Sequence, residues 1–508
     1  MNKDKLPVLV GVGQSLSQWD GTNGPAGAPS PLSLMVDASK AALADAGVEG
    51  LVDAIDTIAA VRIFEDSVRT APHPNGHNTN LPGTLARDIG ASPERLIYEV
   101  VGGQSPQALV NEMARRISEG ELDCALISGS EANRASKAAR KHSVEINWAD
   151  SADTDFEDRG FGAELIAREE IKHGLVAAAY FYGLFENAIA ARDGETRSQH
   201  RRTMAELFQP FSARAATNPY AQFPVEHSVE FLCTPSAKNY EYADPFLKWF
   251  IAQDAVNQGA AVIVMSHAKA DELGIDPANR VYLHGAGDAA DSLISRRPRL
   301  DGSWAMDMAV RGALESANAQ ASDIAHLDIY SCFPCAVASG ASALGIDWRK
   351  DPRPLTLTGG LPFFGGPGNN YSLHGIAEMV STLRANPGNL GLVLANGGWM
   401  SKESVGIYST TPPAHFTAPK LPQTASERLK LRAEDCTGIV ETFTVTHGRS
   451  GPENGIIFAR LENGDRAIAK TDAEGLAILR EDASPVGRKV DISYNSEKQR
   501  GTATFPAS

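Results

Sequence analysis

The sequence predicts an α/β protein with two similar halves, followed by a small all-β domain. Short apolar runs alternate with amphipathic runs over residues 6–132, and this alternation returns after about residue 250. Such alternation is typical of a parallel sheet covered by helices on its faces. The second half repeats the element order of the first, so we interpret the chain as an internal duplication of architecture without clear sequence identity.

The bulk composition excludes several classes of protein. A chain of 508 residues is too long for one ordinary core, so two or three domains are expected. A hydrophobic content of 43% indicates a folded chain, and a net charge of −15 argues against a general nucleic-acid binder. No apolar run reaches the roughly 18 residues of a membrane span, and the N-terminus lacks a secretion signal. We therefore expect a cytoplasmic protein without membrane insertion.

In the first half, apolar runs and helical spacing alternate regularly. Leu32, Met35 and Val36 have the spacing of one helix face, as do Ala42 and Leu43 one to two turns later. We predict strands at residues 6–14, 55–63, 95–101 and 123–130, and helices at 30–47, 81–90 and 105–120. Residues 135–235 lose this rhythm and are interpreted as an insertion over one end of the sheet, where α/β scaffolds often build a substrate site.

The second half follows the same order. We predict strands at residues 257–267, 280–287, 326–333, 390–398 and 404–410, and helices at 305–318, 335–345 and 374–386. Before the last helix lies TGGLPFFGGPGNN, whose glycines permit close backbone approach and turns with positive φ. Asn369 or Asn370 is expected to cap that helix through its side chain.

Composition shifts give the domain boundaries. The first half spans residues 1–249 with its insertion, and the second half spans residues 250–410. Residues 411–426 form a linker rich in proline and threonine, and residues 427–508 alternate apolar and polar positions as in a small barrel. From residue 426 onward there are 12 basic and 13 acidic residues and few aromatics, which argues against oligonucleotide binding.

The cysteines and histidines give no metal or disulfide pattern. The five cysteines are scattered, so we expect reduced thiols and neither a disulfide framework nor a four-cysteine zinc site. No histidine pair has metal-ligand spacing with a third partner, and we predict no bound metal.

Several motifs together resemble the thiolase superfamily, in its sterol-carrier-protein branch. NPYAQF at residues 218–223, NQGAAVIVMS at residues 257–266 and the glycine-rich loop carry the resemblance, which covers residues 6–409. With its extra β domain the chain resembles thiolase-like protein type 1, and the tail is similar to OB-fold subunits that dock on some thiolases. The resemblance implies a duplicated five-layered thiolase fold, with two βαβαβαββ halves, and an OB-like C-terminal domain.

The catalytic thiolase motifs are altered in this sequence. YEVVGGQSPQAL places Gly102 where the family has its nucleophilic cysteine, and LANGG places Ala395 at the acid/base cysteine. The family's His-Asp-Cys-Phe matches Tyr330, Ser331, Cys332 and Phe333, so the oxyanion-hole histidine becomes a tyrosine. Without an acyl acceptor or a thiol base, ordinary thiolase chemistry is expected to be lost.

The remaining motif positions imply contacts with coenzyme A. Gly-His-Pro matches residues 365–367, so Gly366 replaces the histidine, and Asp254 stands where a thiolase serine contacts the coenzyme. The implied coenzyme-contacting positions are Gly102, Gly103, Ser105, Asp254, Phe333, Gly365, Gly366 and Asn396. Gly102 and Gly103 would also leave N–H groups free at a helix N-terminus, where an anion can bind.

Three residues are candidates for catalysis, and each can also have a purely structural role. Tyr330 can donate a hydrogen bond to an oxyanion, or only fill the space of the lost groups. His374, near the start of a helix, can be a neutral base or a gap filler. Cys332, which forms CFPC with Cys335 at a helix start, can be a substitute nucleophile, part of a redox pair or a buried inert thiol.

These residues leave three functions open. The first is an enzyme that makes or breaks a C–C bond in CoA thioesters or β-ketoacyl compounds, with an acetyltransferase-like variant that uses Cys332. The second is a non-catalytic protein that binds acyl-CoA or lipid, and the third is a retro-aldol lyase. Coenzyme A or acyl-CoA is expected as a substrate, with no permanently bound cofactor, and the chain is expected to be a monomer or a homodimer.

Overall fold

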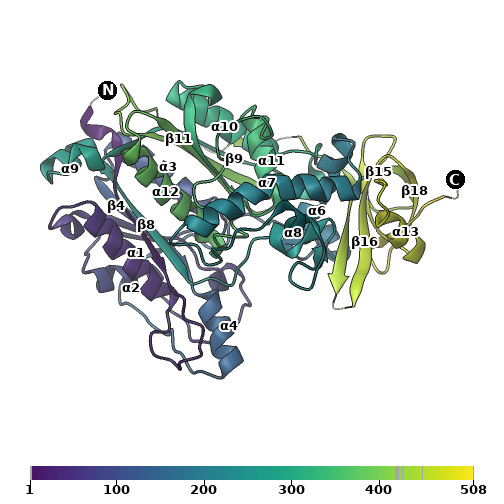
Figure 1. The fold of residues 1–508 in the computed structure, drawn as a ribbon, viewed down its shortest axis with the longest axis horizontal. Helices are drawn as coiled ribbons and strands as arrows, with labels where there is room; N and C mark the ends of the chain where they lie inside the picture. The colour runs from purple at the N-terminus through teal and green to yellow at the C-terminus, as the bar shows by residue number, and fades with distance from the viewer. Residues whose placement is uncertain (1–2, 418–422, 426, 449, 507–508) are drawn as a thin grey trace.

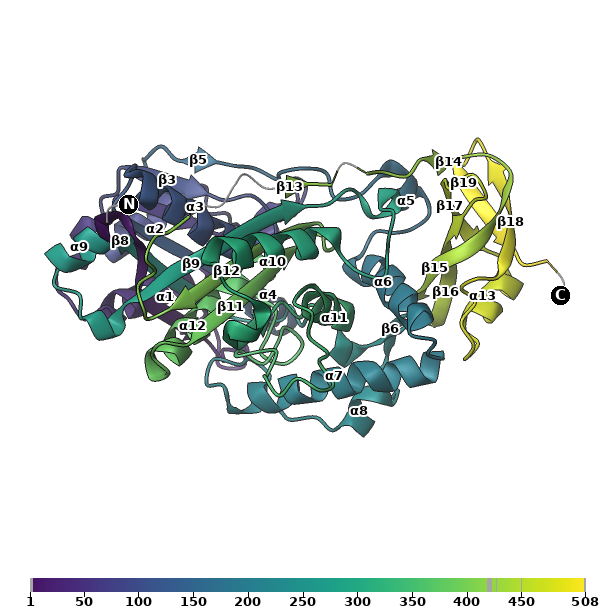
Figure 2. The same cartoon turned by 90° about the horizontal axis from the view of Figure 1, so that it is seen from above.

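The computed structural model describes residues 3–417, 423–425, 427–448 and 450–506. A large α/β body carries a smaller all-β domain at one end (Figure 1, Figure 2). Residues 418–422 and 426 of the predicted linker lie outside the described residues, whereas β13 (Gln423–Thr424) pairs with a strand of the body.

The two halves of the body repeat one series of elements, as predicted. The first half contains β1 (Pro7–Leu16), α1 (Pro31–Asp45), β2 (Thr57–Ala60), α2 (Leu81–Ile89), β3 (Arg95–Tyr98), α3 (Ser105–Glu119) and β4 (Cys124–Glu131). It also contains β8 (Gln258–Ser266), which the sequence analysis placed in the second half, because β8 pairs with β1 and β4. The second contains β9 (Val281–Ala290), α10 (Trp304–Ala317), β10 (Ile324–Ile329), α11 (Pro334–Ala343), α12 (Tyr371–Ala385), β11 (Leu390–Gly397) and β12 (Lys402–Ser409).

One element of the duplication has no counterpart in the described second half. Between α11 and α12, where the first half has β3, the chain forms turns and the short 3-10 helix Gly368–Asn370. Pro352, Pro354, Pro362 and Pro367 lie in this segment and lack the N–H that a strand ladder needs. The glycine-rich loop therefore takes the place of a strand.

The sheet is mixed, whereas the alternation of elements predicted a parallel one. The strands run in the order β10-β11-β12-β9-β1-β8-β4-β2-β3-β5, with β5 at Glu157–Asp158. β2 pairs in parallel with β3 and β4, but β8 is antiparallel to both β1 and β4. β12 is antiparallel to β11 because a tight turn at residues 398–401 joins them, and β8 enters from the insertion without a crossover helix.

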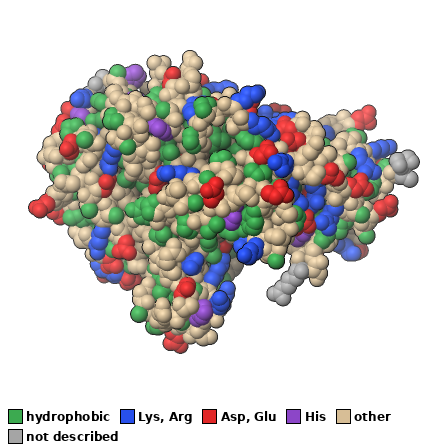
Figure 3. Space-filling view, in the orientation of Figure 1, with side chains coloured by type: hydrophobic (Ala, Val, Ile, Leu, Met, Phe, Trp, Pro, Cys, Tyr) green, Lys and Arg blue, Asp and Glu red, His purple; other side chains and the backbone are tan. Residues whose placement is uncertain are grey.

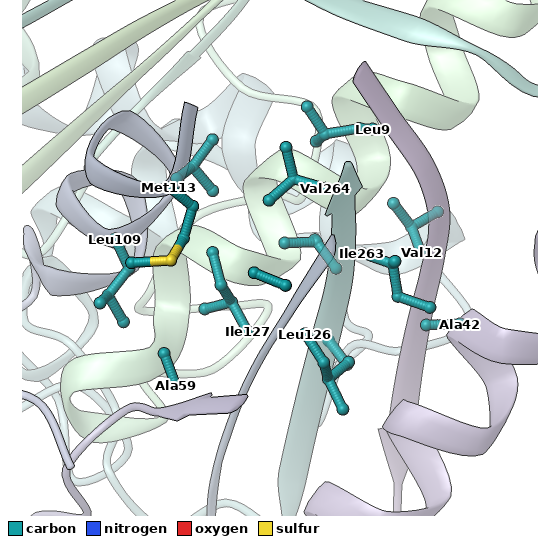
Figure 4. Packing of buried hydrophobic residues seen from close by; sticks show 14 of the residues in the cluster. Leu9, Val12, Ala42, Ala59, Leu109, Met113, Leu126, Ile127, Ile263 and Val264 are labelled. Atoms are coloured by element: carbon teal, nitrogen blue, oxygen red, sulfur yellow. The ribbon is translucent and has the colours of Figure 1, made fainter. Parts of the chain in front are cut away.

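The body consists of five layers, in which helices and strands alternate (Figure 1). The helices α3 and α12 form the central layer. In Figure 1 they lie between the strands of the two halves, with α1 and α2 outside one half and α10 outside the other. Figure 4 shows Leu109 and Met113 of α3 on one side of the β4–β8 pair and Ala42 of α1 on the other. Both faces of this sheet region are thus buried, which explains its nearly continuous apolar strands.

The insertion is mostly helical. It contains α4 (Asn133–His142), α5 (Arg168–Lys172), α6 (Ala178–Arg192), α7 (Arg197–Thr217), α8 (Val229–Cys233), β6 (Glu241–Ala243) and β7 (Phe246–Leu247). The short α9 (His267–Glu272) follows β8. Nearly all of α6 is buried, because it lies between the body and the C-terminal domain (Figure 2).

The C-terminal domain is a closed barrel, as the sequence predicted for an OB-like unit. It contains β14 (Leu431–Arg432), β15 (Cys436–Gly448), β16 (Gly451–Arg460), β17 (Arg466–Thr471), α13 (Ala473–Leu479), β18 (Lys489–Asn495) and β19 (Arg500–Thr504). The pairs β15–β16, β16–β17, β17–β19, β19–β18 and β18–β15 close the ring. Closure satisfies the strand edges.

Polar contacts hold α6 against β15. Asn187 Nδ2 donates to the carbonyl of Phe443 at 2.9 Å, and the Thr442 hydroxyl donates to the carbonyl of Leu184. A Cβ on Gly183 would lie 2.5 Å from Thr444 Oγ1 and 2.6 Å from the carbonyl oxygen of Asp244. The helix can approach the strand this closely only with glycine at residue 183.

Among the helices of the described residues, none is long and apolar enough to cross a bilayer. On the face seen in Figure 3, Lys and Arg side chains are interspersed with Asp and Glu.

We predict that Gly183→Ala destabilises the protein by about 1–3 kcal/mol, because the added methyl group overpacks the interface of α6 and β15. Gly312→Ala is the matched control, since Gly312 also lies in a helix but its Cβ would meet its nearest neighbour at an ordinary 3.6 Å. That change should stabilise the protein by up to about 1 kcal/mol. Denaturant unfolding measures both, and equal effects would contradict the packing argument.

Candidate active site

The N-terminus of α3 meets the ends of β10 and β11 deep in the body. Tyr330 directly follows β10 and is only 6% exposed. A Cβ on Gly103 would collide with the Tyr330 hydroxyl and would lie 2.5 Å from the carbonyl oxygen of Asn396. Glycine at residue 103 is therefore what allows the phenol to lie against the start of α3.

Gln104 fills the space beside this contact. Its Oε1 lies so close to Gly102 and Gly397 that a Cβ on either glycine would overlap it. This oxygen is buried and has no hydrogen-bond partner among the described residues. The amide of Gln104 thus fills the space beside Gly102, the residue that the family resemblance aligns with the first thiolase cysteine.

A polar network continues from Asn396 to the insertion. Asn396 Nδ2 donates to Tyr182 Oη at 3.0 Å and to Cys332 Sγ at 3.6 Å. The Tyr182 hydroxyl donates to the carbonyl of Gly398 at 3.1 Å, and its ring stacks on Phe333 with centroids 4.2 Å apart. Helix α6 therefore contributes a side chain to the site, as expected of the insertion.

Glu403 adds a buried carboxyl group to this network. It faces Asn396 across the β11–β12 ladder, so the two side chains lie on the same face of the sheet. Burial raises its pKa well above the ordinary value, and neither carboxyl oxygen has a hydrogen-bond partner in the described part of the chain. Its charge would raise the pKa values of Tyr330, Tyr182 and Cys332, so all three groups lie within its electrostatic reach.

The phenol and the thiols of the site are held in their neutral forms. Burial raises the pKa of Tyr330 well above its ordinary value, so its hydroxyl keeps a proton to donate. Burial also raises the pKa of Cys332 to about 12, and that of Cys335 well above its ordinary value. Burial of the two thiols therefore opposes the thiolate form that a helix start would favour.

His374 lies in the first turns of α12, as predicted, but does not reach this network. Its side chain is fully buried, with Nδ1 at 2.7 Å from Gln14 Oε1 and its ring against Phe364. Gln14 Nε2 donates to Glu378, so Nδ1 of His374 carries the proton and Nε2 is left without a described partner. Burial lowers the pKa of His374 to about 3, which keeps the imidazole neutral.

The predicted capping of α12 by an asparagine side chain is wrong. Asn370 precedes the helix, but its Nδ2 donates to the carbonyl of Gly129. Asn369 Nδ2 donates to the carbonyl of Arg62 and to Ser67 Oγ, and its Oδ1 accepts from the Gly102 N–H at 3.0 Å. Both amides bridge the two halves, and the N–H of Gly102 is not free for an anion.

The other expected coenzyme-contacting residues are divided between two places. Ser105 begins α3 and donates to the carbonyl of Val100, and Phe333 and Asn396 lie in the network. Gly365 and Gly366 pack instead against residues 252–258, where the Gly366 N–H donates to the carbonyl of Gln253. Asp254 is exposed and forms an ion pair with Lys137 at 2.7 Å.

Comparison with known proteins identifies the family. A family profile described as "Thiolase-like protein type 1 additional C-terminal domain" matches residues 418–497. The crystal structure of a monomeric SCP2-thiolase like protein type 1 from Mycobacterium smegmatis is 38% identical over 100% of both chains, with a TM-score of 0.83. The chain belongs to the SCP2-thiolase-like protein type 1 family. A search of curated proteins gave no match.

More distant structures share the fold of this thiolase-like chain. An acetyl-CoA acetyltransferase from Syntrophomonas wolfei is 17% identical, with a TM-score of 0.57, over 80% of this chain and 99% of its own. The Ltp2-ChsH2(DUF35) aldolase is 18% identical, with a TM-score of 0.59, over 80% of this chain and 98% of the matched chain. At these identities the matches establish only the thiolase fold.

Sequence analysis missed three groups of this thiolase-like site. Tyr182 lies in the insertion, 148 positions before Tyr330, and nothing local marks it. Gln104 lies inside the GGQS motif but was passed over for its neighbours. Glu403 could have been noticed, because a carboxylate one residue before the apolar run SVGIYST lies inside a buried strand once that strand begins at Lys402.

Beside the site, the thiolase-like body holds a buried histidine between two carboxylates. His200 of α7 lies with Nδ1 at 2.7 Å from Glu195 Oε2 and with Nε2 at 2.8 Å from Glu186 Oε1. The second carboxyl oxygen of Glu186 accepts from the Cys335 N–H. Burial alone would lower the pKa of His200, but the two hydrogen-bonded carboxylates outweigh it and raise the pKa to about 9. The three side chains border a hollow of about 740 Å³ lined by α6, α7 and α11.

We predict a pH dependence of stability from this histidine. Its folded pKa of about 9 exceeds the ordinary 6.5, so its contribution of about 3 kcal/mol is full below pH 6.5 and is lost as the pH rises through 9. His200→Gln should lower the free energy of unfolding at pH 6.5 and flatten its slope between these pH values. Denaturant unfolding at several pH values measures this, and parallel curves for both proteins would contradict it.

Proposed function

We propose that this protein cleaves or forms a C–C bond in a CoA thioester by aldol-type chemistry, without a covalent acyl-enzyme. The single observation that carries the proposal is the Tyr330 hydroxyl against Gly103, which follows Gly102, the residue that the family resemblance aligns with the thiolase nucleophile. A neutral phenol in a dry site can donate a hydrogen bond to a thioester oxygen as negative charge develops on it.

The residues of the site do not favour covalent thiolysis, which is the alternative route. Gly102 and Ala395 carry no sulfur, and Cys332 is a protonated thiol with a pKa of about 12. Only the thiolate is an effective nucleophile, so acylation of Cys332 is disfavoured. Aldol cleavage needs no acyl acceptor, because the substrate itself supplies both products.

In the cleavage direction the substrate is a β-hydroxyacyl thioester. A base takes the proton of the β-hydroxyl, the Cα–Cβ bond breaks, and its electron pair moves onto the thioester as an enolate. Tyr330 stabilises the enolate oxygen, and the α-carbon then takes a proton, which gives an aldehyde or ketone and a shorter thioester. The atoms and electrons balance without any oxidant, reductant or second coenzyme molecule.

We assign the proton transfers to Glu403 in place of His374. Its buried carboxyl has a raised pKa, and both its oxygens are free of described hydrogen-bond partners. In the cleavage direction the carboxylate form of Glu403 takes the β-hydroxyl proton, and the carboxylic acid so formed, which burial favours, returns a proton to the α-carbon. His374 is sealed against Gln14 and Phe364 and has no described contact with Tyr330 or Cys332.

The similar structures are consistent with a thioester substrate. One is named an acetyl-CoA acetyltransferase and another an aldolase, and both match about the same 80% of this chain at TM-scores of 0.57 and 0.59. These likenesses support the choice of substrates for testing, whereas the choice of reaction depends on the site residues above.

We predict that Tyr330→Phe lowers the rate of C–C bond cleavage in the thioester substrate by about 10²–10³-fold, since one oxyanion donor typically contributes this much. Purified protein is incubated with a panel of β-hydroxyacyl-CoA and β-ketoacyl-CoA thioesters, with and without free CoA, and products are followed by mass spectrometry. Tyr408→Phe is the matched control, because that buried hydroxyl donates only to Gln107 and should leave the rate unchanged.

The product pattern separates the competing functions. Cleavage of the Cα–Cβ bond that consumes no free CoA supports the aldol proposal. Cleavage that requires free CoA, yields two thioesters and is abolished by Cys332→Ser would overturn it in favour of covalent acyl transfer. Thioester binding without turnover of any substrate would overturn it in favour of the non-catalytic acyl-binding function.

A further inference from the structure

The loop between β2 and α2 brings two imidazoles and a carboxylate together on the surface of the first half. We infer that Asp66, His73 and His77 bind a divalent transition-metal ion of the Zn²⁺ class. One ligand atom from each residue lies within 4.8 Å of the other two. Spacing along the sequence does not mark this set, because the histidines lie in a loop and the carboxylate lies seven residues before the first of them.

The turn HPNGH holds the two imidazoles in place. The Gly76 N–H donates to the His73 carbonyl at 3.1 Å, and Gly76 has a φ of +90°, which favours glycine. The Trp148 N–H donates to the Asn75 carbonyl, which fixes the turn against the chain that follows α4. The two rings stack with centroids 4.0 Å apart, and the Nε2 atom of each approaches Asp66 Oδ1.

The spacing of the donor atoms suits a small tetrahedral ion. Asp66 Oδ1 lies 3.1 Å from His77 Nε2 and 3.8 Å from His73 Nε2. Zinc bonds of about 2.0 Å in a tetrahedron place neighbouring donors about 3.3 Å apart. The two rings are nearly parallel, so one imidazole must also rotate within this surface loop before both Nε2 lone pairs can point at one ion.

Two further groups orient these donors. The Tyr98 hydroxyl donates to Asp66 Oδ2 at 2.5 Å, which leaves Oδ1 turned toward the histidines. Glu65 Oε2 lies 3.8 Å from His73 Nδ1, the nitrogen that does not face Asp66. A carboxylate on the outer nitrogen of a ligand histidine fixes its tautomer and strengthens it as a donor, as in known zinc sites.

The local charge also favours a cation. Among the described residues, Glu65 and Asp66 form ion pairs only with histidines and with no Lys or Arg. The Asp66 side chain is 8% exposed and that of His77 is 43% exposed, so one side of the cluster is closed and the other faces solvent. Three protein ligands with an open side leave a fourth position for water.

The donor set determines which ions fit. Two imidazole nitrogens and one carboxylate oxygen suit Zn²⁺, Co²⁺ and Ni²⁺, whereas Mg²⁺ and Ca²⁺ prefer oxygen ligands alone. The cluster is also linked to the candidate active site. Ser67, which follows Asp66, accepts a hydrogen bond from Asn369 Nδ2, and Asn369 Oδ1 accepts one from the Gly102 N–H.

The full-length protein, stripped with a chelator, tests the inference by titration with Zn²⁺ and with Co²⁺. We expect one ion per chain by elemental analysis, and Co²⁺ should give the visible absorption of a tetrahedral site. His77→Asn and Asp66→Asn should each weaken Zn²⁺ affinity more than 100-fold, and Glu65→Gln by about 10–100-fold. Mg²⁺ should not compete.

His142→Asn is the matched control, since His142 is an exposed histidine outside the cluster. It should bind Zn²⁺ like the original chain, and melting curves of the metal-free variants will show that all of them fold. Uptake of no Zn²⁺ by the stripped protein, or equal affinity in His77→Asn, Asp66→Asn and the control, would overturn the inference. Neither result would bear on thioester cleavage, so the two proposals are tested separately.

Discussion

The close approach of backbone to side chains at a few glycines is the constraint on which the site depends. A Cβ on Gly359 would lie 2.5 Å from atoms of Ala215 in α7, and one on Gly365 would lie 2.5 Å from Gln258 Oε1 in β8. The glycine-rich loop thus packs the insertion, the first half and the end of β10 against one another. Together with Gly103, it fixes Tyr330 within the body and buries Phe363 and Phe364 as core residues.

Burial then determines the chemistry that remains. Each ionisable side chain near Tyr330 has its pKa shifted toward the neutral form, and the network contains donors and acceptors without strong charges. In a dry site neutral hydrogen bonds are strong, but a charged nucleophile is costly to form. Glycine and alanine at the two positions aligned with thiolase cysteines, together with a buried tyrosine, thus all favour neutral hydrogen bonds over a charged nucleophile.

Much of the fold could be predicted from the sequence, because hydrophobic periodicity and turn residues act locally. The start of α3 at Ser105, the position of His374 in α12 and the barrel after the linker follow from such patterns. The site was harder to predict because its side chains meet across long sequence separations.

Three particular failures show why. Asn369 and Asn370 have the composition of helix caps, but their amides find partners on the other half of the body. CFPC lies at a helix start, yet the burial that raises its thiol pKa values depends on α6, 150 residues earlier. Strand alternation predicted parallel pairing, but an insertion can return the chain in either direction. In each case tertiary contacts overrode a valid local rule.

The covalent connection of the barrel to the body has a consequence for how the two parts stay together. Helix α6 joins Tyr182 of the site to β15 through a few polar contacts, which include that of Asn187 with Phe443. As one polypeptide, the barrel has a millimolar-range effective concentration at its docking face. Any opening of this interface would therefore be reversed by a first-order step whatever the dilution, whereas a separate subunit with the same contacts would be lost at low abundance.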